Sequence, residues 1–292
     1  MFVDLVELYC SIDDFWKNFK ADWDKYLIEN NKPKRGPDPF LSIPEMMTII
    51  ILFHQSNFRT FKHFYIFYVQ KYLSKDFPTL ISYPRFVSHM KDLFIPMFCY
   101  LYSLRGNVTG ISFIDSTKLQ VCHNKRISRN KVFKGLAKRG KTTAGWFYGF
   151  KLHLIVNELG EILAFYITPG NISDVSVVDG LSKNIFGKLF GDKGYVSSKL
   201  FQTLLKRGLQ LITSLKSNMK NKLIDIKDKI LLRKRSIIET INDQLKNISQ
   251  IEHSRHRSPA NFLINLLSGL VAYCFQKKKP KLKFSVNDLI AC

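Results

Sequence analysis

The chain has 292 residues, which is enough for one large domain or two smaller ones that each bury a core. Hydrophobic residues make up 46% of it and aromatic residues 13%, a composition that excludes a disordered chain. Lysine and arginine number 45 against 23 aspartate and glutamate, for a formal net charge of +22, so we expect a polyanionic partner, either a nucleic acid or an anionic membrane.

The apolar runs do not favour a membrane. The longest, 46–53 and 262–275, fall short of the roughly 20 residues that a bilayer requires. The first ten residues, MFVDLVELYC, contain acidic residues where a signal peptide has lysine or arginine. The five cysteines are scattered without a CxxC pair, which argues against a disulfide framework or a zinc site. We therefore expect a cytoplasmic protein that binds nucleic acid and no membrane.

Residues 1–105 are predicted to form an all-helical N-terminal domain. Apolar positions recur at helical spacing, and breakers rich in proline, glycine and asparagine separate the segments. The predicted helical segments are 2–28, 43–53, 61–72 and 86–104. The breaker after the first segment contains Lys34 and Arg35, and it is either a basic stretch lying along a phosphate backbone or an ordinary solvated linker.

The character of the chain changes at Gly106. Three strands are predicted at 111–121, 147–156 and 161–168, and a turn of sequence NELG joins the last two. The next elements are predicted as helix 175–184, strand 188–191, helix 198–207, strand 209–214, helix 229–249 and helix 261–275. The order β-β-β-α-β-α-β-α is that of a ribonuclease-H-like α/β fold, a mixed five-stranded sheet with flanking helices.

A basic stretch without core character lies between the first two predicted strands. We predict that it is a loop whose cations contact DNA, with plain solvation as the alternative. The cations in question are Lys125, Arg126, Arg129, Lys131 and Lys134. The aromatic run Trp146-Phe147-Tyr148 that follows is predicted to lie in the core, although an aromatic side chain that stacks on a base is the other interpretation.

Two aspartates stand at the ends of predicted strands. Asp115 follows the apolar run ISFI, where an unpaired charge is costly to bury, so it either caps a loop or binds a metal ion. Asp192 follows the short strand 188–191, and Gly194 permits a sharp turn directly after it. Functional groups gather at such strand ends in α/β sheets. Two aspartates in this position are better evidence for a site than one.

Glu239 lies on a polar stripe of the predicted helix 229–249. At about 100° per residue it shares an arc with Arg235, Asn242 and Lys246, beside an apolar stripe of isoleucine and leucine. Taken alone, these residues favour a solvated face with an Arg235–Glu239 pair over a functional site.

Taken together, the three carboxylate segments resemble DDE transposases of bacterial insertion sequences. The segments are FIDST around Asp115, FGDKGY around Asp192 and RSIIETINDQLK around Glu239. The nearest group is the insertion-sequence-982 family, within a wider class that has a ribonuclease-H-like catalytic domain. The resemblance covers roughly residues 105–280.

The third motif departs from the wider class at one position. That class often has tyrosine, arginine, glutamate and lysine at fixed spacing, and Arg235, Glu239 and Lys246 occupy the last three places. Leu232 stands where the tyrosine would be. This departure affects the role of the tyrosine and leaves the implied metal ligands in place.

The resemblance implies two-metal-ion phosphodiester chemistry. Asp115 would bridge two Mg²⁺ ions, with Mn²⁺ as a substitute, and Asp192 and Glu239 would each bind one of them. The same site would cleave double-stranded DNA at terminal inverted repeats and then join the ends to target DNA. A homodimer is expected because two ends must be brought together.

The resemblance and the charge together predict the residues that contact DNA. They are Arg235, Asn242, Lys246, Lys118, Lys193, Lys34, Arg35 and the loop cations Lys125, Arg126, Arg129, Lys131 and Lys134. The predicted domains are a DNA-binding domain at 1–105, a catalytic domain at 106–280 and a basic tail at 281–292.

Rival interpretations exist for individual residues and for the function. Asp174 is the main rival carboxylate, and we expect it to cap the helix beginning near Val175. His153 is expected to have a structural or DNA-proximal role. The rival functions are a metal-dependent nuclease of the same fold, which cleaves without joining, and a non-catalytic DNA-binding regulator.

Overall fold

The computed structural model describes residues 4–30, 40–143, 145–214, 224–252 and 256–282, and the chain divides into two compact units. One unit comprises 1–104 and 245–277, and the other comprises 105–244 and 278–292. In the described ranges, no helix combines the length and the hydrophobicity needed to cross a membrane.

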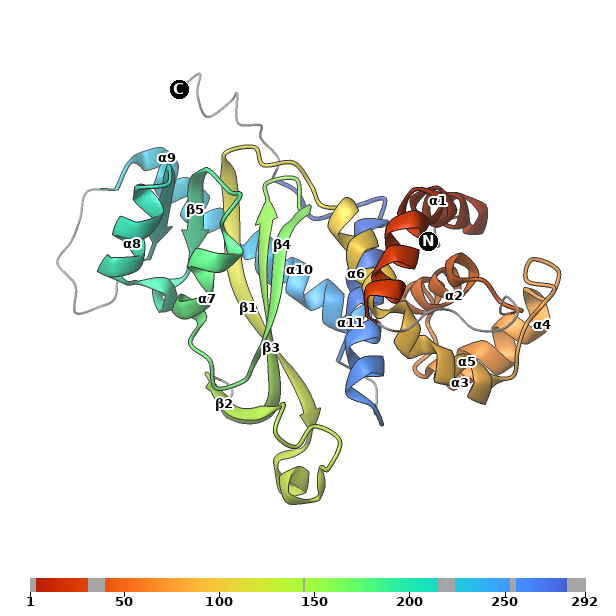
Figure 1. Ribbon diagram of the computed structural model, residues 1–292. Helices are drawn as coiled ribbons and strands as arrows, with labels where there is room; N and C mark the ends of the chain where they lie inside the picture. Colours follow the sequence, from red (N-terminus) through yellow and green to blue (C-terminus); the bar gives the residue numbers. More distant parts are fainter. Residues whose placement is uncertain (1–3, 31–39, 144, 215–223, 253–255, 283–292) are drawn as a thin grey trace. The chain divides into compact units, whose positions relative to one another are not determined.

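The unit that contains the N-terminus is helical, as predicted (Figure 1). Its elements are α1 (Leu5–Glu29), α2 (Ile43–Gln55), α3 (Phe61–Phe64), the π-helical turn η1 (Tyr65–Val69), α4 (Gln70–Tyr72), α5 (Tyr83–His89), the 3₁₀ turn η2 (Met90–Leu93), α6 (Phe94–Ser103) and α11 (Pro259–Cys274). A capping box starts α2, because Ser42 and Glu45 satisfy each other's backbone N–H groups. From Met46 to His54 every residue of this helix is buried, so α2 forms the centre of the unit.

Helix α11 packs with the N-terminal helices rather than with the segment that precedes it in the chain. It contacts α2 and α6, and all but one of its residues from Phe262 to Tyr273 are buried. A helix that is apolar around most of its circumference must be enclosed by other helices, and α2 and α6 provide that enclosure. Residues 245–277 therefore belong to the helical unit.

The second unit is built on a mixed sheet of β1 (Ile111–Cys122), β2 (Lys138–Thr142), β3 (Gly145–Asn157), β4 (Ile162–Pro169), β5 (Gly187–Gly191) and β6 (Leu209–Thr213). The strand order is β2-β3-β1-β5-β6, and β4 also pairs with β3. The pairs formed by β3 are antiparallel, whereas β1, β5 and β6 run parallel. The predicted mixed sheet is confirmed, with β2 as an additional short strand.

The stretch between the first two predicted strands is not the plain loop that we expected. It contains the end of β1, a 3₁₀ turn η3 (Asn124–Arg129) and strand β2. The sequence KRGKT of β2 has no apolar alternation, and its extended form comes from antiparallel pairing with β3. The strand was therefore invisible to hydrophobic patterning.

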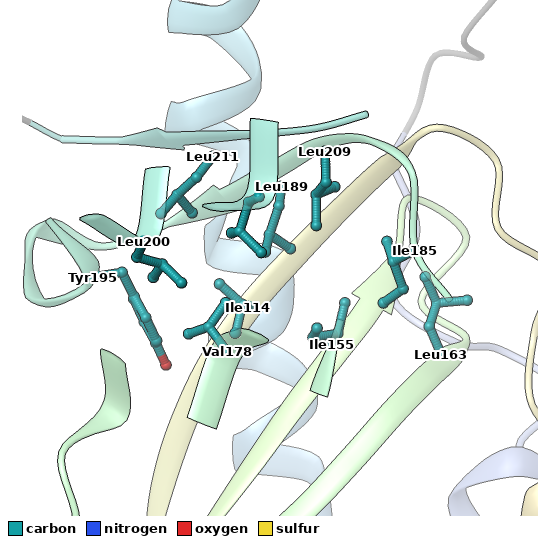
Figure 2. Close-up of a cluster of buried hydrophobic side chains, with 11 residues drawn as sticks. Ile114, Ile155, Leu163, Val178, Ile185, Leu189, Tyr195, Leu200, Leu209 and Leu211 are labelled. Atoms are coloured by element: carbon teal, nitrogen blue, oxygen red, sulfur yellow. The ribbon is translucent and has the colours of Figure 1, made fainter. Parts of the chain in front are cut away.

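Helices α7 (Asp174–Leu181) and α8 (Ser198–Leu205) cover one face of this sheet. Figure 2 shows the buried cluster between them and the strands. Among its members are Ile114, Ile155, Val178, Leu189, Leu200, Leu204 and Leu211. Burying each such side chain contributes about 1.5–3 kcal/mol, which fixes β1 and β5 side by side.

Helices α9 (Ile226–Lys234) and α10 (Ser236–Asn247) replace the single helix predicted at 229–249, with the break at Arg235. The polar side of α10 reaches Asp115 through a hydrogen bond from Asn242. Successive strand residues point to opposite faces, and Ile114 belongs to the cluster under α7 and α8. Asp115 and α10 therefore lie on the other face of the sheet (Figure 1).

Candidate active site

The parallel pairing of β1 and β5 sets Asp115 and Asp192 at the same level. The last pair in the register is Phe113 opposite Phe190, and each aspartate comes two residues later in the chain, with Asp192 directly after the end of β5. Neighbouring strands lie about 4.8 Å apart, so the two backbone positions are close together at the carboxyl end of the parallel strands. The apolar residues before each aspartate, including Ile114 and Leu189, are buried and hold the strands in this register.

Asp115 carries the strongest electrostatic perturbation among these carboxylates. The pKa of Asp115 is raised from 3.8 to about 6, mainly by burial; the charges of Asp192 and Glu239 contribute to the rise, whereas Arg235 and the Ser116 backbone N–H oppose it. Its Oδ2 accepts a hydrogen bond of 3.0 Å from Asn242 Nδ2. The Asn242 side chain is itself buried, so this bond ties α10 to the end of β1.

Asp192 is held by the turn that follows it, the 3₁₀ turn η4 (Lys193–Tyr195). Its Oδ1 accepts a hydrogen bond of 2.8 Å from the Gly194 backbone N–H. A Cβ atom at Gly194 would also stand only 2.8 Å from this oxygen. Glycine at 194 thus leaves room for the Asp192 carboxylate.

Tyr195, which closes the same turn, connects the aspartates to the core. Figure 2 shows its ring beside Val178 and Leu200, with the hydroxyl oxygen directed away from the cluster. Burial raises the pKa of the Tyr195 hydroxyl, and the charges of Asp115, Asp174 and Asp192 add to the effect. The charges of all three carboxylates therefore act on this hydroxyl. No local pattern in the sequence marks Tyr195, because a tyrosine after a glycine is an ordinary core residue.

Glu239 lies on α10, one turn before Asn242, and is exposed. Its Oε1 accepts a hydrogen bond from Arg235 Nη2 at 2.5 Å, forming the i,i+4 ion pair expected from the sequence. Arg235 also lowers the pKa of Asp115, so its guanidinium lies near two of the candidate carboxylates. The structure thus brings Arg235 and Asn242, two of the predicted DNA contacts, to the same place.

Each candidate carboxylate has a partner within the protein: Asn242 for Asp115, Gly194 for Asp192 and Arg235 for Glu239. Within the described ranges, no three His, Cys, Asp or Glu side chains are grouped closely enough to hold a metal ion. The donor set of Asp115, Asp192 and Glu239 nevertheless consists of oxygen atoms only, which suits a hard divalent cation. The half-buried position of Asp115 also fits a cation, because a positive ion compensates a carboxylate that partial burial destabilises.

The other predicted DNA-contact residues have different surroundings. Lys118 is half-buried on β1, opposite Lys151 of β3, and Lys193 is exposed beside Asp192. Lys246 on α10 forms an ion pair of 3.2 Å with Glu252. The five loop cations are all exposed, and they follow the end of β1 that is remote from β5. Lys34 and Arg35 lie outside the described residues.

Asp174 does not cap α7, which corrects the prediction. Ser173 occupies the N-cap position, and Asp174 is the first helical residue. Its Oδ1 lies 3.0 Å from Lys151 Nζ, which also donates to the Ile172 carbonyl. The Asp174 carboxylate thus pairs with Lys151, which lies 23 positions earlier in the chain. No local pattern in the sequence predicts this contact.

His153 lies beside the Lys151–Asp174 pair and is 1% exposed. Its Nε2 is 2.8 Å from Thr168 Oγ1, and its Nδ1 is 3.7 Å from Asp174 Oδ1. Burial lowers the pKa of His153 to about 4, which keeps the ring neutral at neutral pH. Its contacts are those of a residue that fixes the loop before α7 on the sheet.

Comparison with known families agrees with this geometry. Residues 105–259, more than half of the chain, match the family model described as "Transposase DDE domain". No curated protein matches the chain. The matched segment contains the whole mixed sheet, and it also includes Asp115, Asp192 and Glu239.

Proposed function

Since the chain belongs to the family of proteins with a transposase DDE domain, we propose that it cleaves DNA at the terminal inverted repeats of an insertion sequence and joins the freed ends to target DNA. The family makes the chain a transposase with a ribonuclease-H-like catalytic domain, an enzyme that binds DNA and belongs to a class that uses divalent metal ions. The finer assignment to the insertion-sequence-982 group rests on the three sequence motifs.

We assign the chemistry to Asp115, Asp192 and Glu239. The observation that carries this assignment is the hydrogen bond from Asn242 to Asp115, because it joins α10 to the strand end where the two aspartates stand level. Glu239 is one turn away from Asn242 on the same helix. In this proposal, three elements far apart in the sequence each contribute one carboxylate to a site at one end of the sheet.

The electrostatics supports a role in binding cations. A half-buried carboxylate that feels the charges of two others is unfavourable until a positive charge compensates it, and the raised pKa of Asp115 expresses that cost. We propose that Asp115, Asp192 and Glu239 would together hold two Mg²⁺ ions, or Mn²⁺ in their place. Bound ions of this kind activate the attacking oxygen, hold the leaving oxygen and neutralise the phosphate.

To bind a metal ion, the Glu239 carboxylate would have to break its ion pair with Arg235. Its exposed position makes the exchange inexpensive, since an exposed i,i+4 ion pair contributes only about 0.3–0.5 kcal/mol. The guanidinium that is released remains next to Asp115, where it would meet a DNA phosphate by a bidentate hydrogen bond. Arg235 therefore has two partners in the proposal, Glu239 before DNA and metal bind and a phosphate afterwards.

The remaining predicted contacts extend this DNA-binding surface. We propose that Lys193 and Lys246 contact phosphates close to the reacting bond, with Asn242 positioning Asp115 from α10. Strand alternation places Lys118 on the other face of β1 from Asp115, so we propose that it contacts DNA away from the reacting bond. Lys246 would first release Glu252, its present partner. The exposed loop cations, together with Lys34 and Arg35, would hold DNA further from the reaction.

The helical segment 1–105 is proposed to recognise the terminal repeats, 106–280 to carry the chemistry, and 281–292 to add a basic tail. A homodimer is proposed for the step that brings two ends together. Both assignments rest on the family and on the chemistry of joining two ends, not on a contact within the chain.

The test is a reaction of the full chain with Mg²⁺ and labelled DNA that carries the sequences flanking its gene. We expect cleaved and joined products in Mg²⁺ and none in a chelator. Asp115→Asn, Asp192→Asn and Glu239→Gln should each abolish both products while leaving DNA binding intact. Asp243→Asn, an exposed carboxylate on the same helix as Glu239, is the matched control and should retain activity.

The alternatives give different products. Cleavage without joining would identify a nuclease instead of a transposase. Binding without metal-dependent cleavage would leave only a regulator. Full activity of Asp115→Asn would remove that residue from the site.

A further inference from the structure

Part of the β1–β3 hairpin extends beyond the rest of the sheet. Strand β1 pairs with β5 only as far as Phe113, whereas its pairing with β3 continues to Cys122. Beyond the level of Asp115, the hairpin therefore has no parallel strand beside it. We call residues 118–143 and 145–150 the β-arm; it contains η3 and β2 and extends beyond the parallel strands β5 and β6 (Figure 1).

The β-arm has a charge of one sign only. From Ser116 to Asn157 the sequence contains no aspartate or glutamate. Its cations between 125 and 141 are all exposed, and in the described ranges none of them forms an ion pair; they are Lys125, Arg126, Arg129, Lys131, Lys134, Lys138, Arg139 and Lys141. Such a surface attracts a polyanion.

An exposed tryptophan lies among these cations, contrary to the expectation that the aromatic run belongs to the core. Trp146 is 53% exposed, while the next residue, Phe147, is fully buried. Strand alternation explains the difference, because neighbouring residues face opposite sides of the hairpin. Asn124 Nδ2 donates to the Trp146 carbonyl at 2.7 Å, so η3 holds this strand in place.

Two cations flank the indole ring. Lys141 is the cross-strand partner of Trp146, with its Nζ 5.7 Å from the ring centroid, and the Arg139 guanidinium is 5.2 Å from it. These cation–π contacts hold the cations at the ring while the ring remains half in solvent. The arrangement combines an aromatic face and positive charges on one side of a two-stranded ribbon.

The ligand that satisfies both features is an unpaired nucleotide. Its base offers a face for stacking, which a paired and stacked base in a duplex does not, and its phosphates pair with the cations. We propose that the β-arm binds unpaired nucleotides of the DNA, with Trp146 stacking on a base and Arg139 and Lys141 holding the adjacent phosphates. This inference rests on the proposed function, because it concerns the same DNA.

The first test uses tryptophan emission. The chain has three tryptophans, so the difference between wild type and Trp146→Phe isolates the signal of this one. We expect a single-stranded oligonucleotide to quench that signal, and a blunt duplex of the same sequence to leave most of it. Heparin, a polyanion without bases, is the charge control, and equal quenching by heparin would overturn the proposal.

The second test compares affinity for a blunt duplex and for the same duplex with a single-stranded extension. Wild type should favour the extension, and Trp146→Ala should weaken binding to it by about tenfold while changing blunt-duplex binding little. Trp146→Phe should retain most of the preference. The double variant Arg139→Ala, Lys141→Ala should lower the slope of log affinity against log salt by about 2.

Matched controls come from the other end of the strands. Phe186, an aromatic residue that is 56% exposed, and the exposed Lys183 precede β5. Phe186→Ala and Lys183→Ala should leave the preference for the extension unchanged. Thermal unfolding of every variant checks that the fold is intact.

The outcomes separate this proposal from the proposed function. If Trp146→Ala keeps the preference while wild type still cleaves and joins DNA, the β-arm proposal fails and the transposase chemistry stands. If the preference depends on Trp146 but no metal-dependent cleavage occurs, the β-arm proposal stands and the assigned chemistry fails.

Discussion

Asp115 lowers the stability of the folded protein when it is ionised, and it is also a proposed metal ligand. Asp115 is half-buried, and its raised pKa means that the folded chain favours the neutral carboxyl more than the unfolded chain does. A site that binds cations needs the ionised carboxylate. The folded protein therefore loses some stability in order to keep a metal-binding side chain at this position. The hydrogen bond from Asn242 offsets part of this cost without removing it.

The pH dependence of stability follows from the direction of this shift. A folded-state pKa of about 6 against 3.8 means that the stabilisation is complete below about pH 4 and is lost as the pH rises through 6. In a chelator, Asp115→Asn should therefore gain stability over wild type between pH 4 and 7, on the order of 2–3 kcal/mol. Urea unfolding at several pH values measures the difference.

Divalent metal supplies the control for that experiment. Added Mg²⁺ or Mn²⁺ should raise the melting temperature of wild type at pH 7 and affect Asp115→Asn much less, because an ion compensates only the charged side chain. A difference between the two proteins that does not change with pH would contradict the assignment of the cost to Asp115 ionisation.

Gly194 leads to a second prediction for a single residue. A methyl group at this position would stand 2.8 Å from Asp192 Oδ1 and would displace the carboxylate. We expect Gly194→Ala to keep the fold but to require at least about tenfold more Mn²⁺ for half-maximal binding, a loss of about 1.4 kcal/mol. Mn²⁺ titration followed by electron paramagnetic resonance measures this, and unchanged Mn²⁺ affinity would separate the Asp192 geometry from metal binding.

Strand β3 depends on glycine for its contact with β1. A Cβ atom at Gly149 would lie 2.0 Å from the Leu119 carbonyl oxygen, so the two backbones approach closely where β1 has an irregular register. We expect Gly149→Ala to destabilise the protein by about 1–3 kcal/mol, as overpacking does. Chemical denaturation gives the value.

Gly180 in α7 is the matched glycine. It has open space around an added Cβ and no positive φ. Gly180→Ala should therefore stabilise the protein, by up to about 1 kcal/mol, because alanine favours the helix. If both alanine variants changed stability in the same direction, backbone approach at Gly149 would not be the cause.

These elements also show what the sequence could predict. Short apolar runs located the strands that lead to Asp115 and Asp192, because a strand covered on both faces must place apolar side chains on both. Strand β2 was missed, since Lys138–Thr142 has no apolar pattern and becomes extended only by pairing with β3. The break between α9 and α10 at Arg235 was not predicted, because no glycine or proline marks it in the sequence.

The candidate site was predictable to a similar extent. Two strand-end aspartates followed from local pattern, and Glu239 followed from the family motif. The hydrogen bond from Asn242 and the pairing of Asp174 with Lys151 join residues distant in the sequence, so no local pattern could give them. Trp146 was assigned to the core from its aromatic neighbours, although only Phe147 and Tyr148 are covered.

At the scale of the whole molecule, the net charge of +22 is unevenly distributed. Helix α1 carries six acidic residues against three lysines, whereas the β-arm carries no acid. Because α1 has a net negative charge, we expect the phosphate contacts of the helical unit to come from its other segments. This restricts how the proposed recognition of terminal repeats can work.

The salt dependence of DNA binding tests this distribution. Each phosphate contact contributes about 0.9 to the slope of log affinity against log salt, so replacing Lys125, Arg126, Arg129, Lys131 and Lys134 by serine should lower the slope by up to about 4.5. As the control, Asp22→Asn with Asp24→Asn on α1 raises the net charge by two at exposed positions and should leave the slope unchanged. Fluorescence anisotropy at several salt concentrations gives both slopes. A slope that followed the net charge in both variants would mean that DNA responds to the overall field of the protein, and the β-arm would then have no special part in binding.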